Sequence, residues 1–556
     1  MKILILGGYG VFGGRLAELI ADLQGADILI AGRSFDKAQA FCDLHGAFTP
    51  VLASRDRIAT TLAQHDPDLL VDATGPFQNY GDDPYHVIKA CLDAQVNYLD
   101  FADGADFVAG VAQFDTPAKA AGIFVLSGVS SYPVLTAAVL RHFEQDMDVQ
   151  SVEGGIAPSP FAGVGLNVMR AVVGYAGNRV PLMRGGVKTT GVALGESRYY
   201  TIAPPGCLPL RNIRFSLVDV PELQVLPPEM PGLRDIWMGA GPGPEGLHRI
   251  LNVLAKLRVM LSLPALTWLA PLCYRILNLL KFGEHRGGMY IEVKGPARTG
   301  ARKGQMVTRS WHMLAEGDDG PYVPSMAIET LIRKAMQGET PAPGARAAVH
   351  ALELADYDTS FANRDITTGF REDQIDQPLY RVVLGDAFDD LPEPVGRLHD
   401  SRDTRSWSGH VTTRAAQSIL GRFAARLSGF PTQDADGPVT VTFTPDEKGE
   451  LWQRDFGGYK FQTHQSVGQG RNTGLLTETF GPLKIALAVV VTGGKLQLIP
   501  RRWTLFSMPL PKFLLPRGET FETDADGLFR FDVQVQLPLI GHVVAYKGNL
   551  RPDTAS

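Results

Sequence analysis

Short apolar runs alternate with helical patterns throughout the first 130 residues. The runs have the length of buried parallel strands and are almost continuously apolar. Stretches with helical spacing fill the gaps between them. Because strands that alternate with helices indicate a doubly wound parallel sheet, residues 1–130 are predicted to form a Rossmann domain. The predicted strands, or parts of strands, are residues 3–6, 28–31, 51–52, 69–71, 98–99 and 123–126.

A glycine-rich turn connects the first predicted strand to a helix. Gly8, Gly10 and Gly13 fit the spacing G-x-G-x-x-G, and this strand–turn–helix setting is typical of dinucleotide binding. Backbone N–H groups and the positive end of the helix dipole would face the diphosphate. The alternative is a glycine-rich turn without a ligand. The predicted cofactor contacts here are Gly7, Gly8, Tyr9, Gly10, Val11, Phe12 and Gly13.

The end of the second predicted strand indicates which dinucleotide binds. NAD-binding domains usually have an acid there, which binds the ribose 2′-hydroxyl. This chain has Arg33 and Ser34 instead, with Lys37 one turn further on. A guanidinium can donate two parallel charge-assisted hydrogen bonds to a phosphate. We therefore expect these three residues to hold the 2′-phosphate of NADP, with NAD the weaker ligand. A solvated arginine at a strand end is the alternative.

The turn after the fourth predicted strand is the next candidate for a cofactor contact. Ligands of doubly wound sheets lie outside the carboxyl ends of the strands. Thr74, Gly75, Pro76 and Phe77 are therefore expected to border the ribose and the nicotinamide. The alternative interpretations are an ordinary turn proline for Pro76 and a core aromatic for Phe77.

The middle of the chain predicts a second domain, α/β or α+β, over residues 131–317. Its clearest strands are Met289–Val293 and Gln305–Thr308, and a stretch with helical spacing follows Gly320. Residues 353–375 are polar and charged, which predicts a linker.

An uncharged segment, residues 259–274, lies between two arginines in this second domain. It is too short to span a bilayer comfortably, and Pro264 and Pro271 interrupt it. Flanking basic and amphipathic side chains fit a peripheral membrane contact through residues 259–280. We favour the alternative, a buried helical hairpin at a homodimer interface.

The last third of the chain changes to an apolar–polar alternation with glycine turns. Residues 391–427 are predicted to be mainly loop and helix, and several strands follow. The series predicts an α+β domain over residues 376–556 with a curved antiparallel sheet. Such a sheet forms a cup for an apolar ligand, unless a helix packs on its apolar face and leaves no cavity. Arg454, Glu478 and Arg530 lie either in this cup or on its outer face.

Composition narrows the classes of partner. The formal net charge is −6 at pH 7 and no basic tract occurs, which speaks against nucleic acid. The four cysteines are widely spaced and the histidines form no H-E-x-x-H motif, so we expect reduced thiols and no metal site. The first residues lack the pattern of a signal peptide. We expect a cytoplasmic protein, membrane-associated only if residues 259–280 dock.

Motifs in the first 140 residues occur in an order and spacing known from one family. They are Gly7–Gly14, Ala31–Ser34, Thr74–Phe77, Tyr80-Gly81, Cys91, Tyr98–Asp100 and Ser127–Pro133. In these motifs the chain resembles the saccharopine-dehydrogenase-like oxidoreductases, and it does so more weakly to about residue 355. The resemblance implies a dimeric, two-domain reductase that binds NAD(P) and a small-molecule substrate. It also implies a helix near residues 320–352 that returns to the first domain. The family's known reactions act on C–N bonds of amino-acid adducts.

A second resemblance rests on motifs in the last third of the chain. They are Trp452–Phe456, Glu478–Leu483, Pro509–Pro511 and Pro538–Gly541. They resemble an uncharacterised bacterial domain that is often fused behind saccharopine-dehydrogenase-like modules. That domain has no established activity to carry over.

The chain departs from the family at one point that bears on catalysis. Many relatives have Asp-x-x-Gly-Glu after the fifth strand, whereas this chain has Gly104 in place of the glutamate. Asp103 would stand in for it from one residue earlier, and Asp100 begins the motif. Tyr132, just past the sixth predicted strand, is the third candidate for proton transfer, with a packed structural tyrosine as the alternative.

Together these features predict an NADP-dependent oxidoreductase. Hydride would pass between the nicotinamide and a C–N or C–O carbon of a small or apolar substrate. The alternative is a sensor or carrier that binds NADP(H), holds an apolar ligand in the C-terminal cup and catalyses no turnover.

Overall fold

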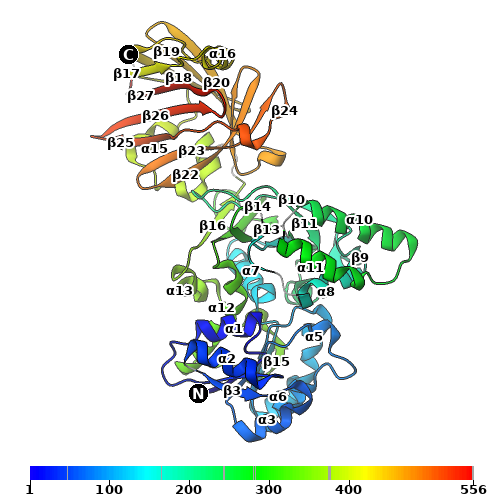
Figure 1. The fold of residues 1–556 in the computed structure, drawn as a ribbon. Coiled ribbons are helices and arrows are strands. Elements are labelled where there is room, and N and C mark those ends of the chain that lie inside the picture. Colours follow the sequence, from blue (N-terminus) through cyan, green and yellow to red (C-terminus); the bar gives the residue numbers. More distant parts are fainter. Residues whose placement is uncertain are drawn as a thin grey trace. The chain divides into compact units, whose positions relative to one another are not determined.

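The computed structural model describes residues 1–46, 48–163, 166–241, 245–279, 281, 283–373 and 377–553. The chain divides into two compact units, whose elements are labelled in Figure 1. The first unit contains Met1–Arg198 and Arg214–Thr367, and the second contains Tyr199–Ile213 and Thr368–Ser556.

A seven-stranded parallel sheet in the first unit confirms the predicted doubly wound fold. Its strand order is β15-β6-β5-β4-β1-β2-β3, and the order reverses between β1 and β4. The side chains of Ile3, Leu4 and Ile5 are fully buried, as expected for a strand covered on both faces. The strands are β1 (Lys2–Leu6), β2 (Asp27–Gly32), β3 (Thr49–Leu52), β4 (Leu69–Asp72), β5 (Asn97–Asp100), β6 (Phe124–Ser127) and β15 (Gly344–Ala347). The helices are α1 (Val11–Leu19), α2 (Phe35–His45), α3 (Ile58–His65), α4 (His86–Ala94), α5 (Ala105–Gly110) and α6 (Asp115–Ala121).

The segment that the family resemblance expects to return to this sheet contains a helix and a strand. α12 (Val323–Met336) packs along α1, and Arg333 donates a hydrogen bond to the carbonyl oxygen of Leu19 at 2.8 Å. β15 then pairs in parallel with β6 at the edge of the sheet. The chain therefore leaves the first sheet after β6 and rejoins it more than 200 residues later.

The second sheet of the first unit is mixed, with strand order β10-β11-β12-β7-β13-β14-β16. The two strands predicted near residues 289 and 305 belong to its longest hairpin, β13 and β14. The strands are β7 (Ser151–Ala157), β10 (Ser197–Tyr200), β11 (Ile213–Leu217), β12 (Asp235–Ala240), β13 (Arg286–Pro296), β14 (Met306–Glu316) and β16 (Ile366–Glu372), beside a separate hairpin of β8 (Arg179–Arg184) and β9 (Val187–Val192). The helices are α7 (Thr136–Glu144), α8 (Leu166–Tyr175), α9 (Glu222–Glu229), α10 (Glu245–Leu261) and α11 (Ala270–Leu279).

The segment predicted as a linker, residues 353–375, contains the boundary between the two units at Thr367, but its described residues form regular structure. A short helical turn, Leu354–Tyr357, begins with a capping box of Glu353 and Asp356. α13 (Asp358–Ala362) and β16 follow. The acids that made the segment look like a linker cap its helical turns, while Tyr357 and Phe361 are buried and stack on each other. Residues 374 and 375 lie outside the described residues.

The second unit contains the antiparallel sheet that the C-terminal pattern predicted. The strand order is β22-β21-β20-β19-β18-β17-β27-β26-β25-β23-β24, and β22 also pairs with β23, so ten of the strands close into a ring. We call this ring the closed sheet. Its strands are β17 (Arg405–Ala415), β18 (Ala435–Asp446), β19 (Gly449–Phe456), β20 (Tyr459–Val467), β21 (Leu476–Phe480), β22 (Leu483–Thr492), β23 (Lys495–Leu505), β25 (Thr520–Ala525), β26 (Leu528–Leu537) and β27 (Gly541–Pro552), and β24 (Met508–Pro509) is an appendage of β23. The helices are α14 (Leu379–Leu384), α15 (Glu393–His399) and α16 (Ile419–Ser428).

β17 corrects the prediction of loop and helix for residues 391–427. It is an eleven-residue strand that pairs with both β18 and β27. Its buried positions include Trp407, Val411 and Thr413, whereas serine and glycine occupy the positions between Trp407 and His410. The apolar–polar alternation is therefore too weak to be recognised along the chain.

Candidate cofactor and active site

The turn between β1 and α1 requires glycine because backbone atoms approach it closely. Gly7 adopts φ 85°, a conformation that side chains rarely allow. A Cβ atom on Gly7 would lie 2.9 Å from the carbonyl oxygen of Ala73, so this turn and the end of β4 lie side by side. A Cβ atom on Gly13 would lie 2.5 Å from the carbonyl oxygen of Gly7. The glycines therefore let the helix start directly above the strand end.

The start of α1 is open to an anion. Gly10 is its N-cap, and it offers no side chain to the first N–H groups of the helix. The first turn contains no acid that would compete with a bound phosphate. Uncapped N–H groups and the positive end of the helix dipole make such a terminus suitable for a diphosphate.

Arg33 and Lys37 lie exposed beyond the end of β2. Among the described residues, neither side chain has a hydrogen-bond or ion-pair partner. Ser34 is placed more firmly, since its Oγ atom accepts a hydrogen bond from the N–H of Lys37 and caps α2. The N–H of Ser34 donates to the Tyr9 hydroxyl at 3.0 Å, and the Tyr9 ring covers Gly32. Two unpaired cations thus stand beside the glycine turn.

A buried carboxylate fixes the turn after β4. Asp72 is fully buried, and its Oδ1 atom accepts hydrogen bonds from the Thr74 N–H at 3.0 Å and the Thr74 hydroxyl at 2.6 Å. The Tyr80 hydroxyl lies 2.7 Å from the Thr74 hydroxyl. Burial raises the pKa of Asp72. Gly75 and Pro76 follow directly, so this network sets where they lie against the glycine turn.

Phe77 occupies a core position. Its ring is buried and packs against the rings of Tyr80 and Phe107, with centroid distances of 4.7 and 5.1 Å. The side chain of Phe77 is therefore a core aromatic, as the alternative interpretation of the sequence stated. Its contribution to a cofactor site is limited to shaping the backbone of the turn.

Asp100 joins two strand ends. Its Oδ1 atom accepts hydrogen bonds from the N–H groups of Ala102 at 2.9 Å and Gly128 at 2.7 Å. Burial is the main reason that its pKa is raised, to about 7. Because it is fully buried and bonded to the backbone, its position is that of a structural carboxyl group.

Tyr132 is also held within the protein. Its side chain is buried, and the hydroxyl donates to the carbonyl oxygen of Gly239 in β12 at 3.4 Å. Burial, followed by the nearby charge of Glu222, raises its pKa well above the usual value. The structure places this tyrosine between the two sheets of the first unit, where it contacts backbone.

Asp103 is the one predicted catalytic candidate that solvent reaches. Its carboxylate accepts a hydrogen bond from the Gln78 side chain at 3.0 Å. Protein atoms nevertheless surround it closely, and this partial desolvation raises its pKa. Asp103 is therefore open to solvent on one side and surrounded by protein atoms on the others.

Two residues of the second sheet's layer interact electrostatically with Asp103, and sequence reasoning missed both. Asp219 follows β11, and Tyr175 ends α8. Burial, then the charges of Asp106 and Asp103, raise the pKa of Asp219 to about 6. Burial, then Asp103 and Asp219, raise the pKa of Tyr175. We call Asp103, Tyr175 and Asp219 the cleft cluster. A lone acid in the apolar run around residues 215–220 was the only available signal for it.

Glu222 is a second carboxyl group that the sequence did not point to. It is fully buried at the start of α9, and its Oε1 atom accepts a hydrogen bond from the Thr136 hydroxyl at 2.9 Å. Burial raises its pKa to about 8, so it is mainly protonated at neutral pH.

Among the described residues, no group of His, Cys, Asp and Glu is arranged to hold a metal ion.

Comparison with known families assigns the two ends of the chain. Residues 3–126 match the model of the saccharopine dehydrogenase NADP binding domain. Residues 391–550 match a domain of unknown function, DUF4166. No curated protein sequence matches the chain.

Several solved structures are similar to it. Saccharopine dehydrogenase (L-Glu forming) from Saccharomyces cerevisiae is 11% identical over 66% of this chain and 99% of its own, with a TM-score of 0.47. Amine dehydrogenase from Mycobacterium smegmatis is 13% identical over 63% and 95%, with a TM-score of 0.34. A meso-dapdh mutant from Clostridium tetani is 12% identical over 64% and 95%, with a TM-score of 0.32.

The glycine turn, the doubly wound sheet and the family match together define the class of the first domain, which is a dinucleotide-binding domain. More particularly, this domain is of the saccharopine dehydrogenase NADP-binding type, which confirms the predicted cofactor. The C-terminal domain is of the DUF4166 type.

Proposed function

We propose that this protein transfers hydride between the nicotinamide of NADP(H) and a substrate carbon that carries nitrogen or oxygen. The observation that carries the proposal is the match to an NADP-binding domain whose glycine turn leads into an uncapped helix start, and the cleft cluster supplies the candidate proton donors. The substrate would bind between the end of the parallel sheet and the second sheet. Phe12 and Phe101, whose rings stack at 5.7 Å, would line this space at the start of α1 and suit a small or apolar substrate.

The cofactor would bind along the opening of the parallel sheet. The residues from Gly7 to Gly13 would hold the diphosphate, and Arg33 and Lys37 would hold the 2′-phosphate, with Ser34 as the cap of α2 between them. The turn from Thr74 to Phe77 would border the ribose and the nicotinamide. The bound cofactor supplies or accepts the hydride.

The residues of the cleft cluster would balance the proton. In the reductive direction, hydride adds to the carbon of a C=O or C=N bond and a proton adds to its oxygen or nitrogen. Asp219, with a pKa of about 6, can give and take a proton near neutral pH. Tyr175, with a raised pKa, stays protonated and donates a hydrogen bond to the same atom. The negative charge of Asp103 favours the protonated form of both groups.

A screen for NADPH consumption tests the proposal. The purified protein is given NADPH and a panel of aldehydes, ketones, imines and amino-acid adducts, and loss of NADPH absorbance is recorded. Turnover of at least one carbonyl or imine is expected. NADPH binding without turnover of any member would instead support a sensor or carrier, which the ligand cavity of the C-terminal domain favours.

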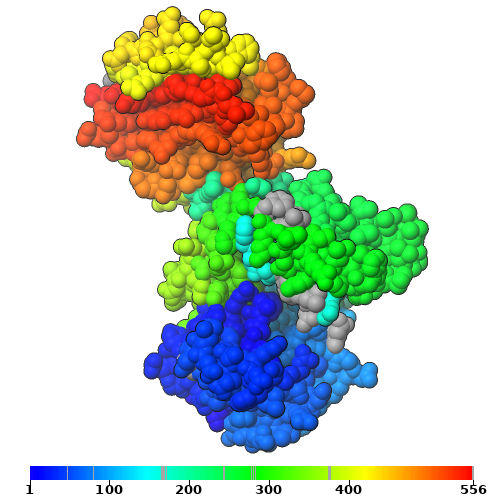
Figure 2. Space-filling view, viewed as in Figure 1, coloured from blue at the N-terminus to red at the C-terminus, as the bar shows by residue number. Residues whose placement is uncertain are grey.

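We also propose that the protein forms a homodimer through the outer face of α10 and α11. Figure 2 shows this segment, in green, at the surface of the first unit. Large apolar side chains of this segment are exposed to solvent: 70% of Met260, 72% of Trp268 and 82% of Leu279. These exposed apolar side chains can pack against those of a second copy of the chain. Arg258, which could otherwise meet a lipid headgroup, donates hydrogen bonds to the carbonyl oxygens of Gly174 and Ala176.

None of the described helices is long and apolar enough to cross a membrane.

A further inference from the structure

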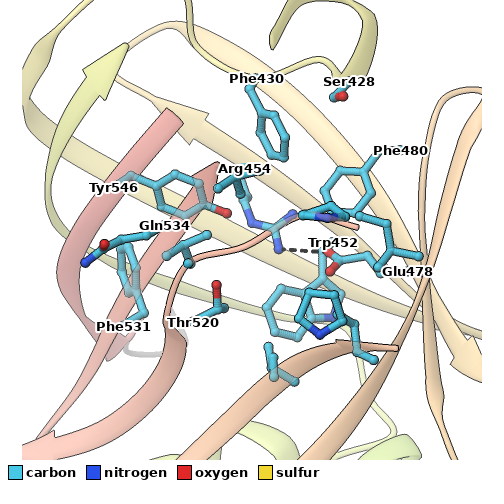
Figure 3. A pocket seen from close by; sticks show the side chains of 18 of the residues that line it. Ser428, Phe430, Trp452, Arg454, Glu478, Phe480, Thr520, Phe531, Gln534 and Tyr546 are labelled. Carbon is cyan, nitrogen blue, oxygen red and sulfur yellow. Dashed lines mark ion pairs between the residues drawn. The ribbon is translucent and has the colours of Figure 1, made fainter. Parts of the chain in front are cut away.

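The closed sheet of the second unit surrounds a cavity that the proposed oxidoreductase site does not use. Its volume is about 130 Å³, and its lining comes from β18 to β23, from β25 to β27 and from the end of α16. Figure 3 shows side chains from several strands pointing into this space. The cup that the sequence predicted is therefore present, and a cavity remains inside it.

One end of the closed sheet is plugged by α14 and α15. Tyr380 of α14 stacks on His399 of α15, with ring centroids 3.6 Å apart. The Tyr380 hydroxyl donates to the Gln465 side chain at 3.0 Å, and His399 pairs with Glu522 at 2.6 Å. All four side chains are buried. A ligand must therefore enter from the other end.

The wall of the cavity is mainly apolar, and ten of its lining residues are aromatic. Flat rings in edge and tilted contacts form a surface on which a planar or branched apolar body can pack. For example, Phe430 packs against Phe480 at 5.3 Å, and Phe456 meets Tyr546 edge-on at 5.5 Å. Seven phenylalanines line the cavity: Phe430, Phe443, Phe456, Phe480, Phe521, Phe529 and Phe531.

A polar group of opposite charges lies in this apolar wall. Arg454 donates to the Thr463 hydroxyl at 2.8 Å, and that hydroxyl donates to Glu478 at 2.8 Å. The guanidinium also lies 3.5 Å from the same Glu478 oxygen, the pair drawn with a dashed line in Figure 3. All three side chains are more than nine-tenths buried. Because the ion pair is balanced, a charged ligand beside it would leave an uncompensated charge in an apolar space.

Three polar atoms of the lining retain unused hydrogen-bonding capacity. They are the Tyr546 hydroxyl, the Gln465 amide nitrogen and the second carboxylate oxygen of Glu478, none of which has a hydrogen-bond partner among the described residues. Figure 3 shows the Tyr546 hydroxyl directed toward the interior. Because their residues line the cavity, a ligand with a group that donates or accepts hydrogen bonds can satisfy these atoms.

The open end of the closed sheet is surrounded by exposed apolar side chains. α16 spans this end: a Cβ atom on Gly421 would lie 2.7 Å from the carbonyl oxygen of His542, and one on Gly481 would lie 3.8 Å from that of Leu427. Arg517 is exposed and also lines the cavity, so the cavity reaches the surface here. The exposed side chains are Ile419, Leu420, Phe423, Phe506, Met508 and Phe513. An apolar molecule that enters here would stay in contact with apolar side chains on its way into the cavity.

We propose that the closed sheet binds a neutral, largely apolar molecule that carries one hydroxyl or carbonyl group. The aromatic wall packs against its body, and the Tyr546, Gln465 and Glu478 side chains bind its polar end. The molecule enters over the rim formed by α16 and the turn after β23.

Calorimetric titration of the full chain with three probes of the same shape tests this site. The probes are 2-naphthol, naphthalene and 2-naphthoate, which carry a hydroxyl, no polar group and a charge. We expect 2-naphthol to bind about ten-fold more tightly than either of the others, the effect of one hydrogen bond. Equal affinities for all three, or the absence of binding, would overturn the proposal. Because the titration omits NADPH, its outcome is independent of the proposed oxidoreductase activity.

Two variants locate the binding. Tyr546→Phe keeps the ring and removes the hydroxyl, so the preference for 2-naphthol over naphthalene should fall while naphthalene binds as before. Tyr85→Phe, in the first unit, is the matched control and should leave both unchanged. Val533→Trp fills the cavity and should abolish binding of all probes in a chain whose circular dichroism matches the parent. Unaltered 2-naphthol binding by Val533→Trp would place the site elsewhere and refute the proposal.

Discussion

Arg33 and Lys37 lie exposed beyond β2, and neither has a partner among the described residues. Among the described residues, Arg33 has no hydrogen bond or ion pair that a ligand would have to break. Its guanidinium is therefore available to a phosphate. The guanidinium can then make two charge-assisted hydrogen bonds, whereas the 2′-hydroxyl of NADH offers no charge. If Arg33 holds the 2′-phosphate as proposed, the preference for NADPH would depend on this one side chain more than on the glycine turn, which both cofactors would use.

Replacing Arg33 by aspartate is expected to reverse the cofactor preference. NADPH affinity should fall by about 10- to 100-fold, since charge-assisted hydrogen bonds to the 2′-phosphate are lost and a like charge faces it. NADH affinity should be unchanged or better. Fluorescence titration with both cofactors measures this, with the exposed Arg57→Asp as control. Parallel losses for both cofactors would show that Arg33 does not distinguish them.

The Asp219→Asn variant tests the proposed proton transfer. We expect kcat for a reducible substrate to fall by about 100-fold or more, with NADPH affinity unchanged. In the parent enzyme, the reductive rate should fall as the pH rises through about 6, because the carboxyl group loses the proton that it must donate. The variant should lack this step. The exposed Asp43→Asn serves as control, and a pH profile identical in variant and parent would exclude Asp219 as the donor.

The residues of the site differ in how far the sequence could reveal them. The glycines and Arg33 belong to one strand–turn–helix segment, so their spacing along the chain carries the signal. Asp103 lies more than 100 residues from Asp219, and only the folded chain brings them together. Asp100 and Tyr132 occupied the right strand ends, but burial and backbone contacts, which no spacing reports, determine their environments.

At the scale of elements, the prediction succeeded for continuously apolar strands and for strands with a clear alternation, and it failed where a strand has neither pattern. β1, β2 and β4 are covered by helices, so their sequences are continuously apolar. β17 and β16 alternate small, polar and apolar residues at the surface of their sheets, and the sequence indicated loop or linker. The closure of the C-terminal sheet depends on pairing between β22 and β23 and on strand order, which the alternation of single strands does not encode.

The start of α9 supplies a test of stability at this scale. Burial raises the pKa of Glu222 to about 8, so the folded chain holds this proton more tightly than the unfolded chain does. Its contribution to the free energy of unfolding is complete below about pH 4, where the carboxyl group is protonated in both states, and is lost as the pH rises through about 8.

The Glu222→Gln variant keeps an oxygen atom that accepts the hydrogen bond from the Thr136 hydroxyl, but its side chain no longer takes up or releases a proton. Urea unfolding between about pH 5 and 8 should show a decline in stability that is steeper for the parent than for the variant. The carboxyl group of Asp100, with a pKa of about 7, titrates in both proteins and cancels in the comparison. Equal slopes would contradict the assignment of a buried, protonated Glu222.

At the scale of the whole molecule, two units carry two different kinds of site. The first unit has an NADP-binding sheet and the cleft cluster, and the second has an enclosed apolar cavity. The proposed activity requires only the first, and the proposed ligand site only the second. Each can therefore fail without the other, and variants in one unit serve as controls for the other.

The exposed face of α10 and α11 predicts the assembly. Light scattering on the parent protein should give the mass of a dimer, and the double variant Met260→Glu, Trp268→Glu should give that of a monomer, because buried acids disrupt an apolar interface. Leu44→Glu, at an equally exposed position on α2, should leave the dimer intact. A monomeric parent that floats with phosphatidylserine vesicles would instead identify this face as a membrane contact.

The central claim is that hydride passes from NADPH bound at the glycine turn to a substrate in the cleft above it. NADPH deuterated at C4 tests this most directly, with mass spectrometry of the products formed from a mixture of carbonyl and imine compounds. The account predicts a product that carries the deuterium in the parent protein and its near absence in Asp219→Asn. Full binding of NADPH with no deuterium in any product would contradict it.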